Sequence, residues 1–380
     1  MPTAIEWCKN ADGTQGSTWN PVTGCMPDFP CWERCYARRM ANRLRERYGY
    51  PKDDPFRPTF HEDKLLKPLW WNKSTTVFPV SMGDLFADGV KDEWIDAVFA
   101  VMTLCRKHTF VVLTKRVQRL GEYINAVAKD TEGLFGDSGI GNNINGMRRI
   151  MLWEMSEKPG GNDKWRWIED QVEHEPDGYP VVTAPGYWEW LGTENEMRTI
   201  ETWPLPNLVI GTSASNQAEW DERVPLLCQI PAWKRTVSVE PMLGPIDMGH
   251  SLPTRLPSGN LIFSNRLGFR PFIHGILCGG ESGPGARPMH PDWVRSLRDQ
   301  CKDAGVAFHF KSWGEWKQTD KDHGYEDGYP FGSFGSQWYP WEVLSACCPC
   351  MVRVGKKRAG RLLDGREHNE LAWTKETANA

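Results

Sequence analysis

Residues 109–116 read TFVVLTKR, an apolar run that ends abruptly in Thr114, Lys115 and Arg116. The run is continuous rather than alternating, which is typical of a parallel strand buried on both faces. The residues that follow, through Val127, have the apolar spacing of a helix. This stretch therefore predicts one strand followed by one helix, with polar side chains where the strand ends.

Similar units recur along the whole chain. Strands are predicted at residues 56–61, 76–80, 109–113, 207–211, 235–239, 274–278 and 307–310. Helices are predicted at residues 36–48, 63–71, 93–105 and 291–304, and in the stretches that run through residues 127 and 228. Such a repeat predicts an α/β fold with a parallel sheet, most simply a complete or partial (β/α) TIM-like barrel. An open doubly wound sheet is the alternative.

Polar residues gather at nearly every predicted strand end. In a barrel the active site lies at the carboxyl ends of the strands, so these residues are candidates for a site. They are Ser81, Asp84, Thr114, Lys115, Arg116, Thr212, Ser213, Glu240, Glu281 and Lys311. For each of them, a structural hydrogen bond that closes the end of the barrel is the alternative explanation.

A loop near the amino terminus carries three cysteines, Cys25, Cys31 and Cys35, at a C-x5-C-x3-C spacing. Three thiolates can hold three irons of a four-iron cluster and leave the fourth iron open for another ligand. Zinc usually requires a fourth protein ligand, and no His or further Cys is nearby to close such a site. Three unrelated cysteines in one loop are the remaining alternative.

Composition limits the classes of function. The chain has 380 residues, which suffice for a large core, and a net charge of −4, which excludes a uniformly basic surface. Its 11 cysteines, without a signal peptide, favour a reducing cytoplasmic compartment in which thiols serve metals or cores. No apolar run reaches membrane-spanning length, so no membrane contact is expected.

The repeat predicts four parts: residues 1–130 with the cysteine loop, an insertion at 131–204, a second half at 205–345 and a tail at 346–380. The insertion is rich in tryptophan, which suits either stacking on bases or the core of a small subdomain. The tail holds Cys347, Cys348 and Cys350, which are candidates for a second metal site.

Positive charge gathers in two places despite the acidic total. One is the predicted helix at residues 36–48 and the other is the tail; the basic residues are Arg38, Arg39, Arg43, Arg45, Arg47, Lys356, Lys357, Arg358, Arg361 and Arg366. A solvated face explains either group alone. Contact with phosphates explains both together.

Several short motifs carry a resemblance to a known family. They are WNPVTGC at 19–25, CYA at 35–37, Ser81 with DLF at 84–86, LTKR at 113–116, EPML at 240–243, GGESG at 279–283, FK at 310–311 with WG at 313–314, and GRLLDG at 360–365. Taken together, they resemble phage-associated proteins with a three-cysteine motif, which are related to radical S-adenosylmethionine enzymes. The resemblance spans most of the chain, outside residues 130–204 and 252–272.

The resemblance implies a [4Fe–4S] cluster on Cys25, Cys31 and Cys35, with S-adenosylmethionine bound to its open iron. An external electron donor would reduce the cluster, and cleavage of the sulfonium would give a 5′-deoxyadenosyl radical that takes hydrogen from a substrate. Two features depart from the usual pattern. The cysteine spacing is wider than C-x3-C-x2-C, and the Gly-Gly-Glu at 279–281 comes late, so Glu281 is not assigned to the cofactor.

Chemistry suggests roles for the strand-end residues. Ser81, Asp84 and the cluster of Thr114, Lys115 and Arg116 are expected to bind the amino and carboxylate groups of the cofactor. Hydroxyls of its ribose would contact Thr212, Ser213 or Glu240. The candidate catalytic residues are Glu281 and Lys311, since they follow later strands, where a substrate would lie.

The expected substrate is a nucleobase, or a group attached to one, in modified phage DNA that would be processed in the host cytoplasm. The expected reaction is isomerisation or another remodelling of that base. Two alternatives stay open: a nucleic-acid-binding protein with a structural cluster, and a radical enzyme that acts on a small metabolite or a peptide. Cleavage of the cofactor under reductant separates an enzyme from a structural cluster.

Overall fold

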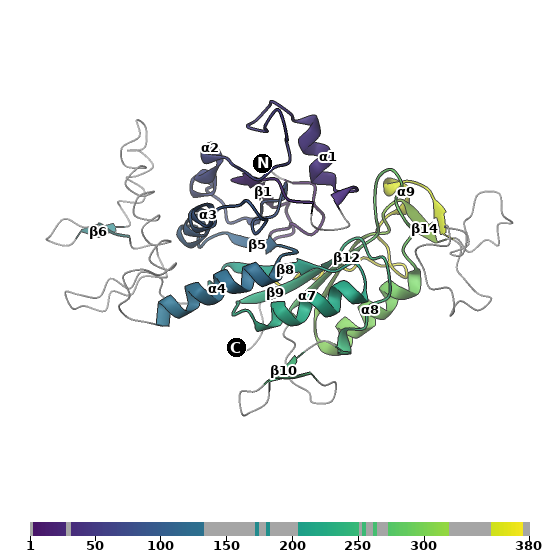
Figure 1. Cartoon of the computed structure of the whole chain (residues 1–380). Helices are drawn as coiled ribbons and strands as arrows, with labels where there is room; N and C mark the ends of the chain where they lie inside the picture. Colours follow the sequence, from purple (N-terminus) through teal and green to yellow (C-terminus); the bar gives the residue numbers. More distant parts are fainter. Residues whose placement is uncertain are drawn as a thin grey trace.

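A computed structural model of the chain describes residues 3–27, 32–132, 204–250, 273–318 and 351–374, and short strands at 172–174, 180–182, 253–255 and 261–263. Its largest element is a parallel sheet in the order β1-β4-β5-β8-β9-β12-β13, curled into half a barrel (Figure 1). The strands of this sheet are β1 Ser17–Trp19, β4 Thr76–Pro79, β5 Thr109–Leu113, β8 Leu208–Ser213, β9 Lys234–Val239, β12 Gly275–Gly279 and β13 Ala307–Ser312.

Four long helices connect these strands, and shorter elements surround them. The long helices are α3 Asp92–Leu104, α4 Val117–Glu132, α7 Gln217–Gln229 and α8 Pro291–Ala304. The short helices are α1 Tyr36–Arg43, α2 Glu62–Leu65, η2 Lys67–Trp70, η3 Met248–His250 and α9 Lys356–Ala359. Antiparallel pairs join β2 Val22–Thr23 to β3 Thr59–Phe60, β6 Val172–His174 to β7 Pro180–Val182, β10 Pro253–Arg255 to β11 Leu261–Phe263, and β14 Trp316–Gln318 to β15 Met351–Arg353.

The sheet is a partial barrel, in agreement with the prediction of a complete or partial (β/α) barrel. Each strand lies beside the next strand of the sheet in chain order, which is the winding of a barrel and not of a doubly wound sheet. The sheet is nevertheless open, because β1 and β13 lie at its two ends and do not pair with each other. All seven strands are parallel, so their carboxyl ends meet along one side, called here the carboxyl edge.

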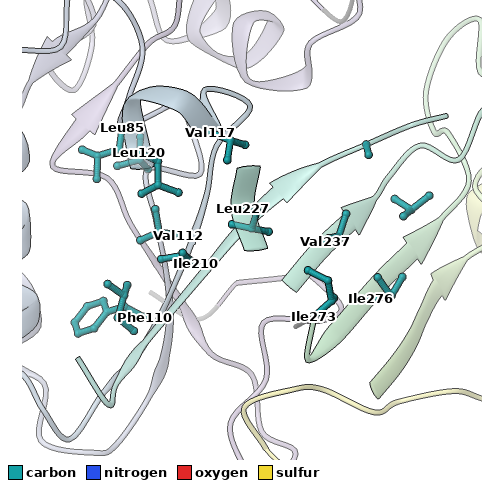
Figure 2. Packing of buried hydrophobic residues seen from close by; sticks show 14 of the residues in the cluster. Leu85, Phe110, Val112, Val117, Leu120, Ile210, Leu227, Val237, Ile273 and Ile276 are labelled. Carbon is teal, nitrogen blue, oxygen red and sulfur yellow. The ribbon is translucent and has the colours of Figure 1, made fainter. Parts of the chain in front are cut away.

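The two faces of the sheet pack against different partners. Side chains such as Val112 and Ile210 belong to the large core formed with the long helices, where Leu120 and Leu227 lie opposite them (Figure 2). Their strand neighbours alternate to the other face, where Val209 and its counterparts on β5 and β12 form a second apolar cluster. Because both faces are apolar, the strands have the continuous runs from which they were predicted.

The two ends of the described chain meet on the second face and fill it. Trp7 packs edge-on against Trp373 with 6.0 Å between ring centroids, and both are buried with Val209. Lys234 Nζ donates a hydrogen bond of 2.5 Å to the carbonyl of Ala372. Gly275 makes room for this segment, since a Cβ there would lie 2.9 Å from Cβ of Ala372. The carboxyl-terminal segment is therefore part of the core of the half-barrel.

Replacing Trp373 by alanine should destabilise the fold by about 3–5 kcal/mol, because the ring is buried and its loss leaves a cavity. Urea unfolding measures the change. Leu362→Ala is the control, since Leu362 is 55% exposed and should shift stability by no more than about 0.5 kcal/mol. Equal shifts in the two variants would contradict a packing role for the carboxyl-terminal segment.

His309 on β13 makes stability depend on pH. It is fully buried, and burial together with the nearby charges of Arg361 and Lys9 lowers its pKa from 6.5 to about 3. Below pH 6.5 the unfolded chain binds a proton that the folded chain does not, so the stability present above that pH is lost as pH falls towards about 3. The contribution is at most about 1.4 kcal/mol per pH unit.

We therefore expect the free energy of unfolding to fall less steeply with acid in His309→Leu than in the unaltered chain. Urea unfolding at a series of pH values between neutrality and mild acid measures the slope. Parallel curves for the two proteins would show that His309 is not the group that titrates.

Several sequence-based predictions were correct and three were wrong. The single helix predicted at 63–71 is instead the short helix α2 followed by the 3-10 helix η2. Strand 109–113 and helix 291–304 have the predicted bounds. The predicted strand at 56–61 does not join the sheet; only Thr59–Phe60 is extended, and it pairs antiparallel with β2. The helix predicted at 36–48 ends at Arg43, since Glu46 and Tyr48 have positive φ angles. The first strand of the sheet is instead β1, a three-residue strand.

The predicted insertion at 131–204 falls in sequence between β5 and β8, which pair directly. Apart from residues 131, 132 and 204 and the strands β6 and β7, its residues lie outside the described part of the chain, as do Cys347, Cys348 and Cys350. None of the helices in the described ranges is long and apolar enough to cross a membrane.

Candidate functional site

Two glycines in close contact bring the cysteine loop to the carboxyl edge. The amide of Asp84 donates to the carbonyl of Gly24 at 3.1 Å. A Cβ on Gly83 would lie 2.3 Å from that carbonyl oxygen, and one on Gly24, whose φ is +95°, would lie 2.2 Å from another backbone oxygen. Neither position has room for a side chain. The contact places Cys25 beside the loop that follows β4.

Asp84 is the centre of a hydrogen-bonded cluster at the ends of β4 and β5. Its Oδ1 accepts from Thr114 Oγ1 at 2.7 Å and from the amide of Phe86 at 3.0 Å. Its Oδ2 accepts from Arg116 Nη1 at 3.2 Å and from the amide of Lys115 at 3.3 Å. Because β4 and β5 are neighbours, residues 30 positions apart in sequence meet here. Thr114, Lys115 and Arg116, three of the predicted site residues, thus all donate hydrogen bonds to Asp84, which is a fourth.

Arg116 also contacts the cysteine loop. Its Nη1 lies 3.4 Å from Sγ of Cys25, and its side chain is only 9% exposed. Burial and the carboxylate of Asp84 raise the pKa of the Cys25 thiol, whereas the charge of Arg116 opposes that rise. A buried guanidinium held in this position would stabilise negative charge on the sulfur.

Cys25 and Cys35 differ from the other described cysteines. Both are partly exposed and pack against one small apolar cluster made of Ala37, Ala41, Tyr50 and Phe56. The remaining described cysteines are buried, and burial raises the pKa of those at 8, 105 and 228 to about 12. Only the cysteines of the loop are therefore suited, among the described thiols, to act as accessible ligands.

These residues fit an iron–sulfur cluster. The donors are soft thiols on one loop, next to apolar side chains and a buried cation, and such surroundings suit a group that carries negative charge. Cys31, the third predicted ligand, lies outside the described residues. Within the described ranges, no three His, Cys, Asp or Glu side chains are grouped to hold a metal ion.

Ser81 lies at the same edge, in a network that the sequence analysis did not predict. Its Oγ bonds to Oδ1 of Asn20 at 3.1 Å, and the same oxygen accepts from the amide of Met82 at 3.0 Å. The hydroxyl of Tyr36 donates to the carbonyl of Ser81. Burial of this hydroxyl, with Cys35 and Glu240 nearby, raises the pKa of Tyr36, so the group stays a donor. Asn20 and Tyr36 both belong to the short motifs that carry the resemblance. Those motifs were the sequence signal that could have indicated this network.

Glu240 and Lys311 form an ion pair across an intervening strand. Lys311 Nζ lies 2.8 Å from Oε2 of Glu240, although β12 separates their strands. The pair forms above Gly279, where a Cβ would lie 3.3 Å from Cβ of Lys311 and 3.5 Å from Oε1 of Glu240. That Oε1 is buried and has no donor among the described residues, which leaves it available to a ligand.

Glu281 is held in a separate group of charges. Its carboxylate accepts from Arg287 Nε at 2.8 Å and Nη2 at 2.9 Å, and lies 3.8 Å from Arg34. Burial opposes its ionisation, but the hydrogen bonds and charges of both arginines outweigh burial and lower the pKa of Glu281. The carboxylate is therefore ionised and paired, and Arg287 is a partner that sequence patterns did not predict.

The two hydroxyls at the end of β8 differ in position. Thr212 is two residues after Ile210, so both side chains lie on the face of the sheet that the long helices cover. The hydroxyl of Thr212 is buried there without a partner among the described residues. Ser213 is partly exposed at the strand end. Ser213 is thus better placed than Thr212 to contact a ligand.

Comparisons with known proteins give a family and no named relative. A search of the curated proteins finds no match, and a search of the solved structures finds none either. The model of a family described as "Protein of unknown function (DUF5131)" matches residues 2–372. Since this match covers nearly the whole chain, including the cysteine loop and every strand of the half-barrel, the protein belongs to the DUF5131 family.

Proposed function

We propose that this protein is a radical S-adenosylmethionine enzyme with a [4Fe–4S] cluster on Cys25, Cys31 and Cys35. The observation that carries the proposal is the position of Cys25 and Cys35, the partly exposed thiols at the carboxyl edge, with Arg116 3.4 Å from Cys25. When bound, the cluster and the cofactor supply reductive cleavage of the sulfonium and a radical that takes hydrogen from the substrate.

The side chains of the carboxyl edge have distinct roles in this proposal. Asp84 orients Arg116 against Cys25, while Ser81, Thr114 and Lys115 supply polar groups for the methionine part of the cofactor. Glu240 accepts a hydrogen bond from the ribose through its unpaired Oε1, and Ser213 is the further ribose contact, since Thr212 lies on the helix-covered face. Lys311 on β13 and Glu281 in the loop after β12 face the substrate in this proposal.

The proposed substrate is a nucleobase, or a group attached to one, in modified phage DNA. The resemblance to phage-associated radical enzymes supports this choice, and so do the two basic segments of an otherwise acidic chain. A base that is stacked within a duplex does not reach the carboxyl edge of the sheet, so it must flip out of the duplex at a cost of a few kcal/mol. The proposed reaction is an isomerisation or another remodelling of that base or its appended group.

The proposal is tested with reduced, anaerobic protein and S-adenosylmethionine. Modified phage-type DNA, plain DNA and the free nucleoside are offered in parallel, and the digested nucleosides are separated and weighed. A mass change or isomer shift in the modified DNA, with formation of 5′-deoxyadenosine, is the expected result. Lys311→Met should lose the nucleoside product but keep its iron, since the side chain of Lys311 bonds to Glu240 and not to a described cysteine of the loop.

Two outcomes would overturn the proposal in different ways. Iron without any cleavage of the cofactor would indicate a structural cluster in a binding protein. Cleavage that is stimulated by a small metabolite or a peptide, and by none of the nucleic acids, would leave a radical enzyme with another substrate.

A further inference from the structure

Two segments of the described chain carry a strong local excess of positive charge. Residues 33–47 hold six arginines against two glutamates, and residues 353–361 hold five basic residues and no acidic one. The chain as a whole has a net charge of −4. Positive charge is therefore concentrated in these two places.

The arginines of α1 and the turn after it differ from arginines elsewhere in the described ranges. Those on the long helices are paired with carboxylates, for example Arg119 with Asp92 at 2.7 Å and Arg298 with Asp364 at 2.5 Å. In contrast, the arginines at 38, 39, 43, 45 and 47 make no ion pair with a described carboxylate. No described carboxylate neutralises their charge, although Arg45 and Arg47 donate hydrogen bonds to carbonyl groups and Arg38 lies over the ring of Trp32.

The loop after β12 joins the two basic segments in space. Arg34 Nη1 donates to the carbonyl of Gly285 at 2.7 Å, and Arg353 Nη2 donates to the carbonyl of Gly283 at 3.0 Å. Arg39 lies on the same loop, since a Cβ on Gly283 would be 3.4 Å from its Nη2. Figure 1 shows α1 and α9 on the two sides of this region. The segments thus form one basic surface beside the carboxyl edge.

Exposed aromatic and apolar side chains are interleaved with these charges. Of the four large hydrophobic residues that are exposed in the described chain, Tyr36, Met40 and Tyr48 belong to α1 and the turn after it. Tyr36 as a residue is 55% exposed, while its hydroxyl donates to the carbonyl of Ser81. The ring is thereby held between the basic surface and the predicted cofactor residues.

We propose that the basic surface, defined as Arg38, Arg39, Arg43, Arg45, Arg47, Arg353, Lys356, Lys357 and Arg358, binds the phosphodiester backbone of single-stranded or locally opened DNA, and that Tyr36 stacks on the base nearest the site. Cations in a row together with an exposed aromatic ring are the features by which proteins hold single strands. The inference deepens the proposed function and rests on it, because it supplies the route by which a base would reach the cluster.

Binding of a labelled single-stranded oligodeoxynucleotide, measured by fluorescence anisotropy over a range of salt concentrations, tests the basic surface. A variant with Arg39, Arg43, Lys356 and Lys357 all changed to glutamine should bind about 10-fold more weakly or worse, and its salt slope should fall by about 3 if each side chain meets one phosphate. The matched control changes Lys73 and Lys302 to glutamine. Both are exposed, and they precede β4 and β13, at the opposite edge of the sheet.

Tyr36 is tested with a pair of variants. Tyr36→Leu should weaken binding about 5-fold or more through loss of stacking. Tyr36→Phe keeps the ring and loses only the bond to Ser81, so it should bind like the unaltered protein. Equal losses in both variants would assign Tyr36 a structural role and overturn the stacking part of the proposal.

Failure of this inference is distinguishable from failure of the proposed function. DNA binding that is unchanged in the four-residue variant, or weakened equally in the control, overturns the basic surface even if the protein cleaves its cofactor. Competition by polyglutamate as effective as that by DNA also overturns it, since charge alone would then suffice. Loss of DNA binding with normal iron content and normal uncoupled cofactor cleavage supports it. DNA binding by a protein without iron supports the surface and contradicts the radical chemistry.

Discussion

Replacing Cys25, Cys31 and Cys35 together by alanine is expected to remove all iron and inorganic sulfide from anaerobically purified protein. Without three thiolates the remaining protein groups cannot hold a four-iron cluster. The brown colour and the cleavage of S-adenosylmethionine should disappear with the metal. Iron and sulfide analysis, together with the visible spectrum, measures the effect.

A core thiol provides the control for this experiment. Cys228 is buried on α7, and burial raises its pKa to about 12, so Cys228→Ala should keep its full iron content. Iron that persists in the triple variant would contradict the assignment of the ligands. Purified protein that contains zinc in place of iron would contradict the cluster itself.

Replacing Asp84 by alanine is expected to reduce stability by about 1–3 kcal/mol, because the buried hydroxyl of Thr114 and the buried amide of Phe86 lose their acceptor. Asp84 also pairs with Arg116 at 3.2 Å, and the side chain of Arg116 is 9% exposed. The same change should weaken binding of S-adenosylmethionine, since Arg116 and Thr114 lose the group that orients them. Urea unfolding and calorimetric titration with the cofactor measure the two effects.

Two further variants test whether the effect comes from the charge of Asp84 or from its hydrogen bonds, and whether an exposed ion pair has the same effect. Asp84→Asn keeps one acceptor for Thr114 and the amide of Phe86 but loses the charge, so it should be intermediate. Asp92→Ala breaks an exposed pair with Arg119 and should cost no more than about 1 kcal/mol. Weaker cofactor binding with intact iron in Asp84→Ala supports its role at the cofactor. Loss of iron together with stability would make Asp84 a folding residue.

Local patterns predicted the strands and helices whose environment is uniform. Strand 109–113 lies between two apolar faces, so every position favours a hydrophobic residue and the run is unmistakable. Helix α8 begins after His290 and ends at Ala304, before Gly305 in a left-handed conformation, and such boundaries are visible in sequence. β1 was missed because three residues are too few to show a pattern. The strand predicted at 56–61 includes Pro58, which interrupts it, and its short extended part pairs with β2.

The sequence by itself determined the parallel α/β fold and the positions of polar residues at strand ends. It also determined a loop with three cysteines. Strand order follows chain order, so the closeness of Asp84 to Thr114 and Arg116 follows directly from the fact that β4 and β5 are neighbours.

Only the tertiary structure decided which of the remaining charges meet. Lys311 reaches Glu240 because Gly279 on the strand between them has no side chain, and no local pattern encodes that path. Arg34 and Arg353 contact one loop although they are far apart in sequence. The curl of the sheet determines such contacts, because it brings the loops of distant strands together along one edge. Packing of Trp7 against Trp373 has the same origin, since the curl leaves a face that the two ends of the described chain fill together.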